Sequence, residues 1–186
     1  MLSKRRAPLK LLPEVLLACH APLYRYARSL CREESTAEDL VQETFRRALG
    51  AASKPREATL ENVRPWMFTI LRHIWHNELR QRTHDPLSSS AAILFGGGEP
   101  ETPERVLNRK MIRSEVRHAL EALPETYREV VMLREIESLS YAEIAAIIQC
   151  PVGTVMSRLA RGRALLRELL ANLDATAGTR AGGVGR

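Results

Sequence analysis

Residues Ser140–Arg167 read SYAEIAAIIQCPVGTVMSRLARGRALLR, a pattern typical of two helices joined by a very short break. Ser140 and Glu143 have the spacing of a capping box at the start of the first helix, and Pro151 marks its end. The second helix carries four arginines and no acidic residue. A short helix, a tight turn and a basic second helix fit the DNA major groove. The segment therefore predicts a helix-turn-helix that contacts DNA.

The second helix has two distinct faces. Helical spacing predicts an inward stripe made of Val155, Leu159, Gly162, Leu166 and Leu169. The outward face consists of Ser157, Ala160, Arg161 and Ala164, flanked by Arg158, Arg163 and Arg167. Because its central residues are small, this face can sit deep in a groove, with Arg161 and Ser157 at base edges and the flanking arginines at phosphates. The alternative is a surface helix whose arginines are merely solvated.

Helical patterns also fill the N-terminal part of the chain. We expect a first helix over Leu11–Cys31, bent or divided near Pro22. A second helix should start after Ser35, with Glu38 completing a capping box, and end at Gly50. A third should cover Pro65–Arg82, with Pro65 in the first helical position. No strand pairs are expected. The sequence therefore predicts an all-α fold.

Two of these helices have polar faces with more than one interpretation. The helix before Gly50 has a polar stripe of Asp39, Gln42, Glu43 and Arg46, which suits either solvent or a basic protein partner. The helix over Pro65–Arg82 has an acid-free side formed by Thr69, Arg72, His73, His76 and Arg80. That side could follow a DNA backbone, accept splayed bases or simply be solvated. His73 and His76 also have the spacing of a metal pair, but a third ligand is not obvious, so surface histidines are the favoured interpretation and no metal or cofactor is expected.

Composition narrows the partner and the compartment. The chain has 186 residues, a formal net charge of +6 and a pI of about 9.6, which favours nucleic acid over a membrane surface as partner. Its three cysteines are widely spaced, which favours a reducing compartment. The apolar run near the N-terminus is interrupted by Pro13 and Glu14 and is too short to span a membrane. We therefore expect a cytoplasmic protein without membrane insertion.

The segment HDPLSSSAAILFGGGEPETP, which follows Thr83, breaks every helical period. It predicts two small helical domains, over residues 10–84 and 105–173, joined by a flexible linker over 85–104. The glycine-rich end, residues 174–186, is expected to be a disordered tail.

Three motifs in order resemble the extracytoplasmic-function sigma factors of the bacterial sigma-70 family. They are AEDLVQETFRRAL, RPWMFTILRHIWHNELRQR and, after the linker, LPETYREVVMLREIESLSYAEIAAIIQCPVGTVMSRLARGRALL. The resemblance covers nearly the whole chain. It implies a non-enzymatic protein that gives core RNA polymerase its promoter specificity, often in a stress or envelope response and under the control of an anti-sigma factor.

The resemblance also assigns roles to residues. Docking on the β′ clamp helices of the polymerase falls to Asp39, Gln42, Glu43, Phe45 and Arg46, and the β flap is a second polymerase contact. Recognition and melting of the −10 element, with single-stranded bases held in pockets, falls to Arg64, Trp66, Thr69, Arg72, His73, His76 and Arg80. Reading of the double-stranded −35 element falls to Tyr141, Thr154, Met156, Ser157, Arg158, Arg161 and Arg163. The family's first domain, region 2, corresponds to residues 10–84, and its region 4 to 105–173.

Departures from the family pattern leave the promoter sequence open. Family members commonly have Lys or Arg at the position of Met156 and Gly at the position of Gln149. They more often have Asn at the position of His73 and Asp at the position of Asn77. A glutamine in a left-handed turn would cost roughly 1 kcal/mol.

Two rival functions stay open at this point. The first is an autonomous regulator that uses only the helix-turn-helix, and the second is a metal-dependent nuclease using His73 and His76. The nuclease lacks support because the sequence shows no phosphate-binding loop, no HExxH and no paired carboxylates in an apolar setting.

Overall fold

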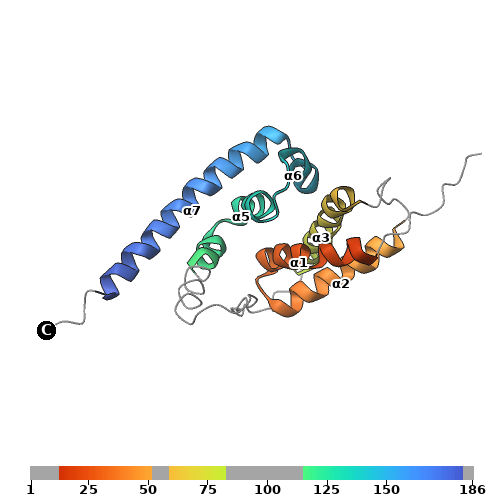
Figure 1. Ribbon diagram of the computed structural model, residues 1–186, viewed down its shortest axis with the longest axis horizontal. Coiled ribbons are helices and arrows are strands. Elements are labelled where there is room, and N and C mark those ends of the chain that lie inside the picture. The colour runs from red at the N-terminus through yellow and green to blue at the C-terminus, as the bar shows by residue number, and fades with distance from the viewer. Residues whose placement is uncertain (1–12, 52–58, 83–114, 182–186) are drawn as a thin grey trace, which may run out of the picture.

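The computed structural model describes residues 13–51, 59–82 and 115–181, with side chains described through residue 172. All regular secondary structure in these ranges is helical, which confirms the predicted fold class (Figure 1). In chain order the elements are α1 (Pro13–Cys31), α2 (Glu34–Gly50), α3 (Leu60–Arg82), a helix over 115–122, α5 (Glu125–Val131), the π-helical turn η1 (Met132–Ile136), α6 (Tyr141–Ile148) and α7 (Val152–Ala181).

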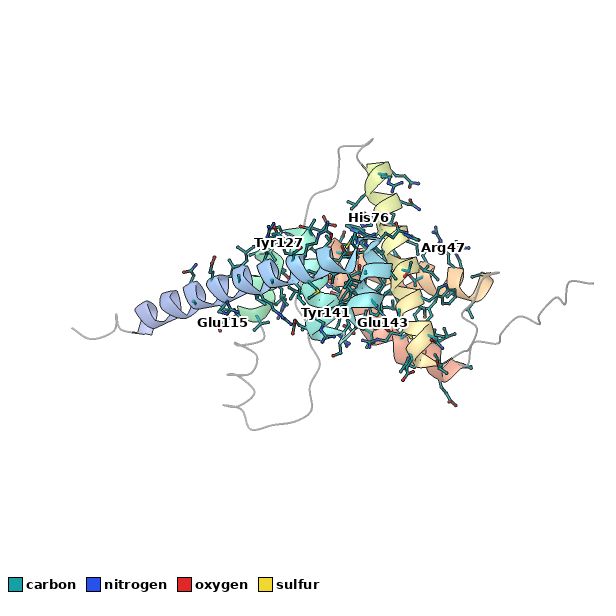
Figure 2. The ribbon with its side chains drawn as sticks, turned by 90° about the horizontal axis from the view of Figure 1, so that it is seen from above. Arg47, His76, Glu115, Tyr127, Tyr141 and Glu143 are labelled. Carbon is teal, nitrogen blue, oxygen red and sulfur yellow. The ribbon has the colours of Figure 1, made fainter. Side chains whose placement is uncertain are left out.

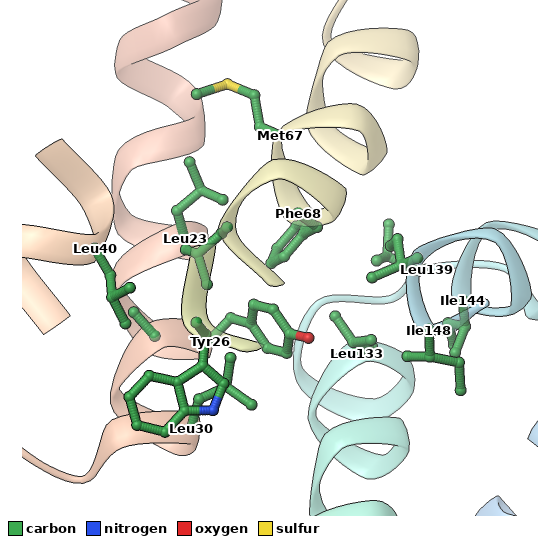
Figure 3. Packing of buried hydrophobic residues seen from close by; sticks show 14 of the residues in the cluster. Leu23, Tyr26, Leu30, Leu40, Met67, Phe68, Leu133, Leu139, Ile144 and Ile148 are labelled. Atoms are coloured by element: carbon green, nitrogen blue, oxygen red, sulfur yellow. The ribbon is translucent and has the colours of Figure 1, made fainter. Parts of the chain in front are cut away.

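Helices α1, α2 and α3 form the N-terminal domain, in which each helix packs against the other two. Their apolar stripes meet in one core, where Leu23, Leu40, Met67 and Phe68 have no exposed surface (Figure 3). Full burial of one such side chain stabilises a fold by about 1.5–3 kcal/mol. This shared core therefore holds the three helices in place relative to one another.

Two expectations about where the N-terminal helices begin are wrong, and the helix expected to be bent or divided near Pro22 is not divided. Pro22 does not divide α1, because the helix continues past it with the next side chain, Leu23, fully buried. Helix α2 has no capping box at Ser35; it starts at Glu34, and the carboxylate of Glu33 accepts hydrogen bonds from the Ser35 and Thr36 hydroxyls at 3.1 and 2.7 Å. A carboxylate at this end also complements the helix dipole.

Helix α3 starts at Leu60, five residues before the predicted start at Pro65. Its first turn is held by the carbonyl of Thr59, which accepts from the N–H groups of Asn62 and Val63. The missing N–H of Pro65 removes a single intrahelical bond, whereas the earlier turn buries Val63 completely. Burial therefore outweighs the proline.

The C-terminal domain consists of the helix over 115–122 and all elements after it. Helix α7 lies across α5 and α6 as a long rod (Figure 1). The predicted inward stripe is confirmed at Val155 and Leu159, which are buried, and at Gly162. A Cβ atom at Gly162 would lie 2.8 Å from Cγ2 of Val131, so only glycine allows α5 and α7 to approach this closely.

The C-terminal end of α7 differs from the prediction. The helix continues to Ala181, so the expected disordered tail from 174 is wrong for residues 174–181. Residues 174–177 contain neither glycine nor proline, and their two alanines favour a helix, which explains the longer extent. The predicted linker at 85–104 and residues 182–186 lie outside the described residues.

The two domains lie against each other. Helix α3 packs on α6, and α1 packs on α5 and η1. Figure 3 shows Tyr26 and Phe68 of the N-terminal domain facing Leu133 and Leu139 of the C-terminal domain, and these buried side chains belong to one continuous cluster. The sequence predicted the two domains but not this contact.

Candidate nucleic-acid and polymerase interfaces

The predicted helix-turn-helix is formed by α6 and α7. Ser140 is the N-cap of α6, where its hydroxyl accepts from the N–H of Glu143 at 3.2 Å. The Glu143 carboxylate in turn accepts from the N–H of Ser140 at 2.7 Å. The capping box is therefore confirmed, and it fixes where α6 begins.

The turn between the two helices is set by Gln149. Its φ of 55° and ψ of 50° lie in the left-handed region, where glycine is favoured and a glutamine costs roughly 1 kcal/mol. The backbone N–H of Cys150 closes the turn by donating to the carbonyl of Ala145 at 3.1 Å. Helix α7 begins at Val152, two residues after that closure.

The outward face of α7 is open to solvent. Met156 is 52% exposed, and Ser157, Ala160, Arg161 and Arg163 are exposed as well. Thr154 and Arg158 are half-buried, as is Tyr141 on α6, whose ring lies 4.9 Å from the Arg134 guanidinium carbon. The predicted −35 residues therefore lie on one side of the helix-turn-helix, which we call the α7 face, and residues 152–167 of α7 contain no acidic side chain.

Arg163 is held by a neighbour on η1. Its Nη2 and Nε lie 2.6 and 2.9 Å from Oε1 of Glu135, and this hydrogen bonding raises the pKa of Arg163. Because both side chains are exposed, the pair adds little stability. It does orient the guanidinium along the edge of the α7 face.

The predicted −10 residues lie on α3, and we call their side of the helix the α3 face. Three of them touch the C-terminal domain: Arg64, Arg72 and His73. Trp66, Thr69 and His76 are half-buried, and Arg80 is exposed. Figure 2 places His76 on α3 beside the C-terminal helices.

His76 shows how crowded the α3 face is. Burial lowers its pKa from the ordinary 6.5, with a smaller contribution from the nearby Arg72 guanidinium. Its Nε2 is buried and has no hydrogen-bond partner within the described part of the chain. A helix that faced open water would solvate this nitrogen.

Two buried carboxylates join the domains, and sequence reasoning missed both. Glu137 accepts from Arg25 Nε and Nη2 at 2.8 and 3.0 Å and from Arg64 Nη2 at 2.5 Å. Glu129 accepts from the Tyr26 hydroxyl at 2.6 Å and from Arg72 Nε at 2.7 Å. Burial, together with the Glu129 carboxylate, raises the pKa of Tyr26 well above its usual range. Arginine side chains therefore neutralise both carboxylates.

The backbone explains how Glu137 reaches the boundary. Helix α5 ends in the π-helical turn η1, in which the N–H of Glu137 donates to the carbonyl of Met132 at 3.0 Å. Ser138 then adopts a φ of 55°, and the chain turns toward α6. Turns of this kind often occur at functional sites. Nothing in helical periodicity predicts the turn.

Helix α2 carries the predicted polymerase-docking residues. Asp39, Gln42 and Arg46 are exposed, and Glu43 and Phe45 are half-buried. Glu43 accepts from Arg46 and Arg47 at 2.6–2.7 Å, and these hydrogen bonds lower its pKa to about 2. The His20 ring stacks on Phe45 with centroids 6.1 Å apart. The stripe is therefore a preformed, partly acidic surface.

Other chemistry finds little support in the described ranges. They contain no cluster of three His, Cys, Asp or Glu side chains arranged to hold a metal ion. His73 instead shares a hydrogen bond with Gln149, with 3.0 Å between the two Nε2 atoms. All three cysteines are free. None of the described helices has a stretch long and apolar enough to cross a bilayer.

Comparison with known proteins gives matches to both domains. Residues 16–84 match the family described as Sigma-70 region 2, and residues 113–166 match Sigma-70, region 4. The ECF RNA polymerase sigma factor EcfG of Rhodopseudomonas palustris is 33% identical over 155 residues, which cover 83% of this chain and 82% of that protein. The ECF RNA polymerase sigma factor SigE of Mycolicibacterium smegmatis is also 33% identical, over 80% of this chain and 57% of its own length.

A solved structure resembles both domains together. It is the co-crystal structure of the sigma factor RpoE with the anti-sigma factor NepR from Bartonella quintana, with a TM-score of 0.68 and 29% identity. The match covers 85% of this chain and 95% of that one. The chain therefore belongs to the extracytoplasmic-function RNA polymerase sigma factors of the sigma-70 family, which are transcription initiation factors.

Proposed function

We propose that this chain binds bacterial core RNA polymerase and directs transcription initiation at promoters that carry matched −35 and −10 elements. The observation that carries this proposal is the arginine-rich α7 face of a capped helix-turn-helix. A surface of this kind suits the major groove. The chain supplies binding specificity, and the polymerase supplies catalysis.

The α7 face would read the −35 duplex. Ser157 and Arg161 lie in the middle of the exposed side, where they can reach base edges, while Arg158 and Arg163 on the flanks can meet phosphates. Met156 offers an apolar contact, such as to a thymine methyl group, where a charged residue is common in the family. The preferred −35 sequence is therefore expected to differ from that of relatives with a cation there.

The α3 face would hold the −10 element as a melted single strand. Arg64, Arg72 and Arg80 provide cations for phosphates, and Trp66 provides a ring on which a base can stack. The N-terminal core fixes the helix that carries them. On this proposal, residues 10–84 and 105–173 are the two promoter-binding domains.

Helix α2 would dock on the β′ clamp helices, and the C-terminal domain on the β flap. Asp39 and Gln42 are exposed, and Glu43 is kept ionised by Arg46 and Arg47, so the stripe presents fixed acceptors to a basic partner. An anti-sigma factor is a further proposed partner, supported by the similar RpoE structure that contains one. A protein with these partners would act in the cytoplasm.

Reconstituted transcription tests the function. The purified full chain is mixed with core polymerase and a promoter library, and the transcripts are sequenced. We expect new starts that depend on both proteins and share one −35 and one −10 sequence. A chain that ignores core polymerase, yet binds operators or cleaves DNA alone, would instead be an autonomous regulator or a nuclease.

A further inference from the structure

Two apolar side chains at the start of α7 are open to solvent. Val152 is 42% exposed and Met156 is 52% exposed. Because they are four residues apart on one helix, their side chains are neighbours on its surface. The turn that carries them is fixed, since the carbonyl of Pro151 accepts from the N–H groups of Thr154 and Val155 at 2.9 and 3.2 Å. Val152 and Met156, which we call the apolar pair, therefore form a preformed apolar surface.

The described residues leave this part of α7 uncovered. Gly153 follows Val152 in the first turn, and a Cβ atom built on it would meet nothing within 4 Å beyond its own stretch of helix. Other apolar side chains of α7, such as Val155 and Leu159, are instead buried in the core. Burial of the apolar pair is therefore a gain in free energy that only a partner can supply.

Charge complementarity around the apolar pair favours duplex DNA as that partner. Residues 152–167 contain four arginines and no acidic side chain. Arg163 lies two turns after Met156 on the same side of α7, and Glu135 holds its guanidinium in place. In a helix-turn-helix, the first residues of the second helix meet base edges in the major groove. The apolar pair thus has the position that reads bases, with cations beyond it for phosphates.

The chemistry of the pair selects one group on the bases. Neither side chain carries a strong hydrogen-bond donor or acceptor. Purine edges and the cytosine amino group are polar, and an apolar side chain that covers them removes water without replacing its hydrogen bonds. The C5 methyl group of thymine is the apolar exception in the major groove. Because 5-methylcytosine carries the same group at the same ring position, an apolar contact accepts both bases.

We propose that Val152 and Met156 bind the C5 methyl groups of pyrimidines in the −35 duplex. The chain then prefers thymine or 5-methylcytosine opposite the apolar pair over uracil or unmethylated cytosine. Methylation of a cytosine at that position strengthens promoter binding, so the pair makes the chain sensitive to DNA methylation. This inference rests on the proposed −35 role of α7 and adds the chemical group that its first turns recognise.

Each buried methyl group adds a small but measurable gain in affinity. The apolar area that one methyl group removes from water lowers the dissociation constant about fourfold. Two adjacent methyl groups, one against each member of the apolar pair, lower it about fifteenfold. These factors should stay the same at different salt concentrations, because no phosphate contact changes. A salt-independent preference therefore separates a methyl contact from an electrostatic one.

The test uses the full chain and the duplex that it prefers from a randomised library. Fluorescence anisotropy gives the dissociation constant for that duplex and for copies in which each thymine in turn is replaced by uracil, which removes only the methyl group. Each cytosine is likewise replaced by 5-methylcytosine. We expect one or two neighbouring positions at which loss of the methyl group weakens binding about fourfold, or its addition strengthens binding by the same factor.

Substitutions of these exposed side chains assign the effect to the apolar pair without disturbing the core. Met156→Ala should abolish the methyl preference at one position, and Val152→Ala at the neighbouring one. Met156→Leu, which keeps a long apolar side chain, should retain the preference. Leu17→Ala is the matched control, because it removes an exposed apolar side chain from the N-terminal domain, and it should leave every preference unchanged.

The outcomes separate the methyl contact from the proposed function, because transcription with core polymerase is measured in parallel. A methyl preference that Met156→Ala removes supports the contact, even if transcription is absent and the sigma function fails. Equal affinity for thymine and uracil at every position overturns the contact, even if transcription is normal, and would indicate a protein partner for the apolar pair instead. A preference that survives in the double variant V152A/M156A overturns it as well, as does a chain that binds all duplexes alike.

Discussion

The α7 face and the α3 face are both proposed DNA-binding surfaces, yet the chain presents them in opposite ways. On α7, the arginines lie on an open surface, and Arg163 pairs with Glu135, an exposed residue of the same domain. On α3, Arg64 and Arg72 contact buried carboxylates of the other domain. The proposed duplex-reading arginines are therefore open to a partner, whereas two of the proposed −10 arginines already hold carboxylates of the other domain.

The largest expected effect comes from Asp39→Arg, which should separate the two faces. A charge reversal on the α2 stripe places like charges together at the proposed polymerase contact, at a cost of several kcal/mol. We expect polymerase-dependent transcription to be lost, while binding of −35 duplex by the free chain is retained. Co-purification with core polymerase and a gel-shift assay measure the two effects.

Glu38→Arg is the matched control for Asp39→Arg. It makes the same charge change at an exposed neighbouring position outside the proposed docking set. If Asp39→Arg and Glu38→Arg impair polymerase binding equally, or if neither does, the docking assignment is wrong.

The next effect concerns stability beneath the covered face. Phe68 is fully buried on α3 and meets Tyr26 edge to face at 5.2 Å, so Phe68→Ala should lower the free energy of unfolding by about 3–5 kcal/mol. On the open face, Met156→Ala should change it by no more than about 0.5 kcal/mol. Urea denaturation followed by circular dichroism compares them. Equal losses of unfolding free energy in the two variants would show that Phe68 is no more buried than Met156.

A smaller effect is expected for Arg161→Ala. If Arg161 contacts a base, its loss should weaken binding of the preferred −35 duplex by about 1–3 kcal/mol and relax specificity at one position. Because the α7 face is exposed, fluorescence anisotropy should detect this loss in the free chain. Arg167→Ala, which removes an equal charge farther along α7, should weaken binding to all duplexes alike. An unchanged preference in Arg161→Ala would refute the base contact.

The smallest effect is a pH dependence confined to the covered face. Burial, chiefly, lowers the pKa of His76 in the folded chain below 6.5, so the unfolded chain binds the proton more readily. Stability is therefore complete above the unfolded pKa and declines as the pH falls below about 6.5. His76→Gln should flatten the thermal melting temperature between pH 7 and 5, relative to His73→Gln, which retains His76. A steeper decline in His76→Gln would contradict the burial of this imidazole.

Local signals made much of the α7 face predictable. The capping box at Ser140 and the inward stripe of Val155 and Leu159 depend on residues within a few positions of each other, whereas the left-handed turn at Gln149 was implied by the family resemblance. The resemblance to sigma factors could also be assigned from three motifs in order. The roles of individual residues on α2, α3 and α7 stay predictions.

The covering of the α3 face could not be predicted from local pattern. Arg25 and Glu137 are 112 residues apart, and no period or spacing connects them. Glu129 follows Arg128 in an amphipathic helical pattern, so from the sequence it resembles a solvent-exposed acid. Only the packing of α1 and α3 against it shows that it is buried. The π-helical turn that directs Glu137 inward leaves no mark in composition. The early start of α3 was missed because the burial of Val63, a tertiary effect, overrides the proline signal.

The spread of distances between the domains in the free chain tests most directly whether one of the two proposed DNA-binding faces is covered and the other open. Spin labels carried on unnatural amino acids at Leu17 of α1 and Ala171 of α7, both exposed, leave the native cysteines unmodified. Double electron–electron resonance should give one narrow distance distribution for the free chain, because the domain contact fixes the two labels relative to each other. A broad distribution for the free chain would contradict a C-terminal domain that covers the α3 face.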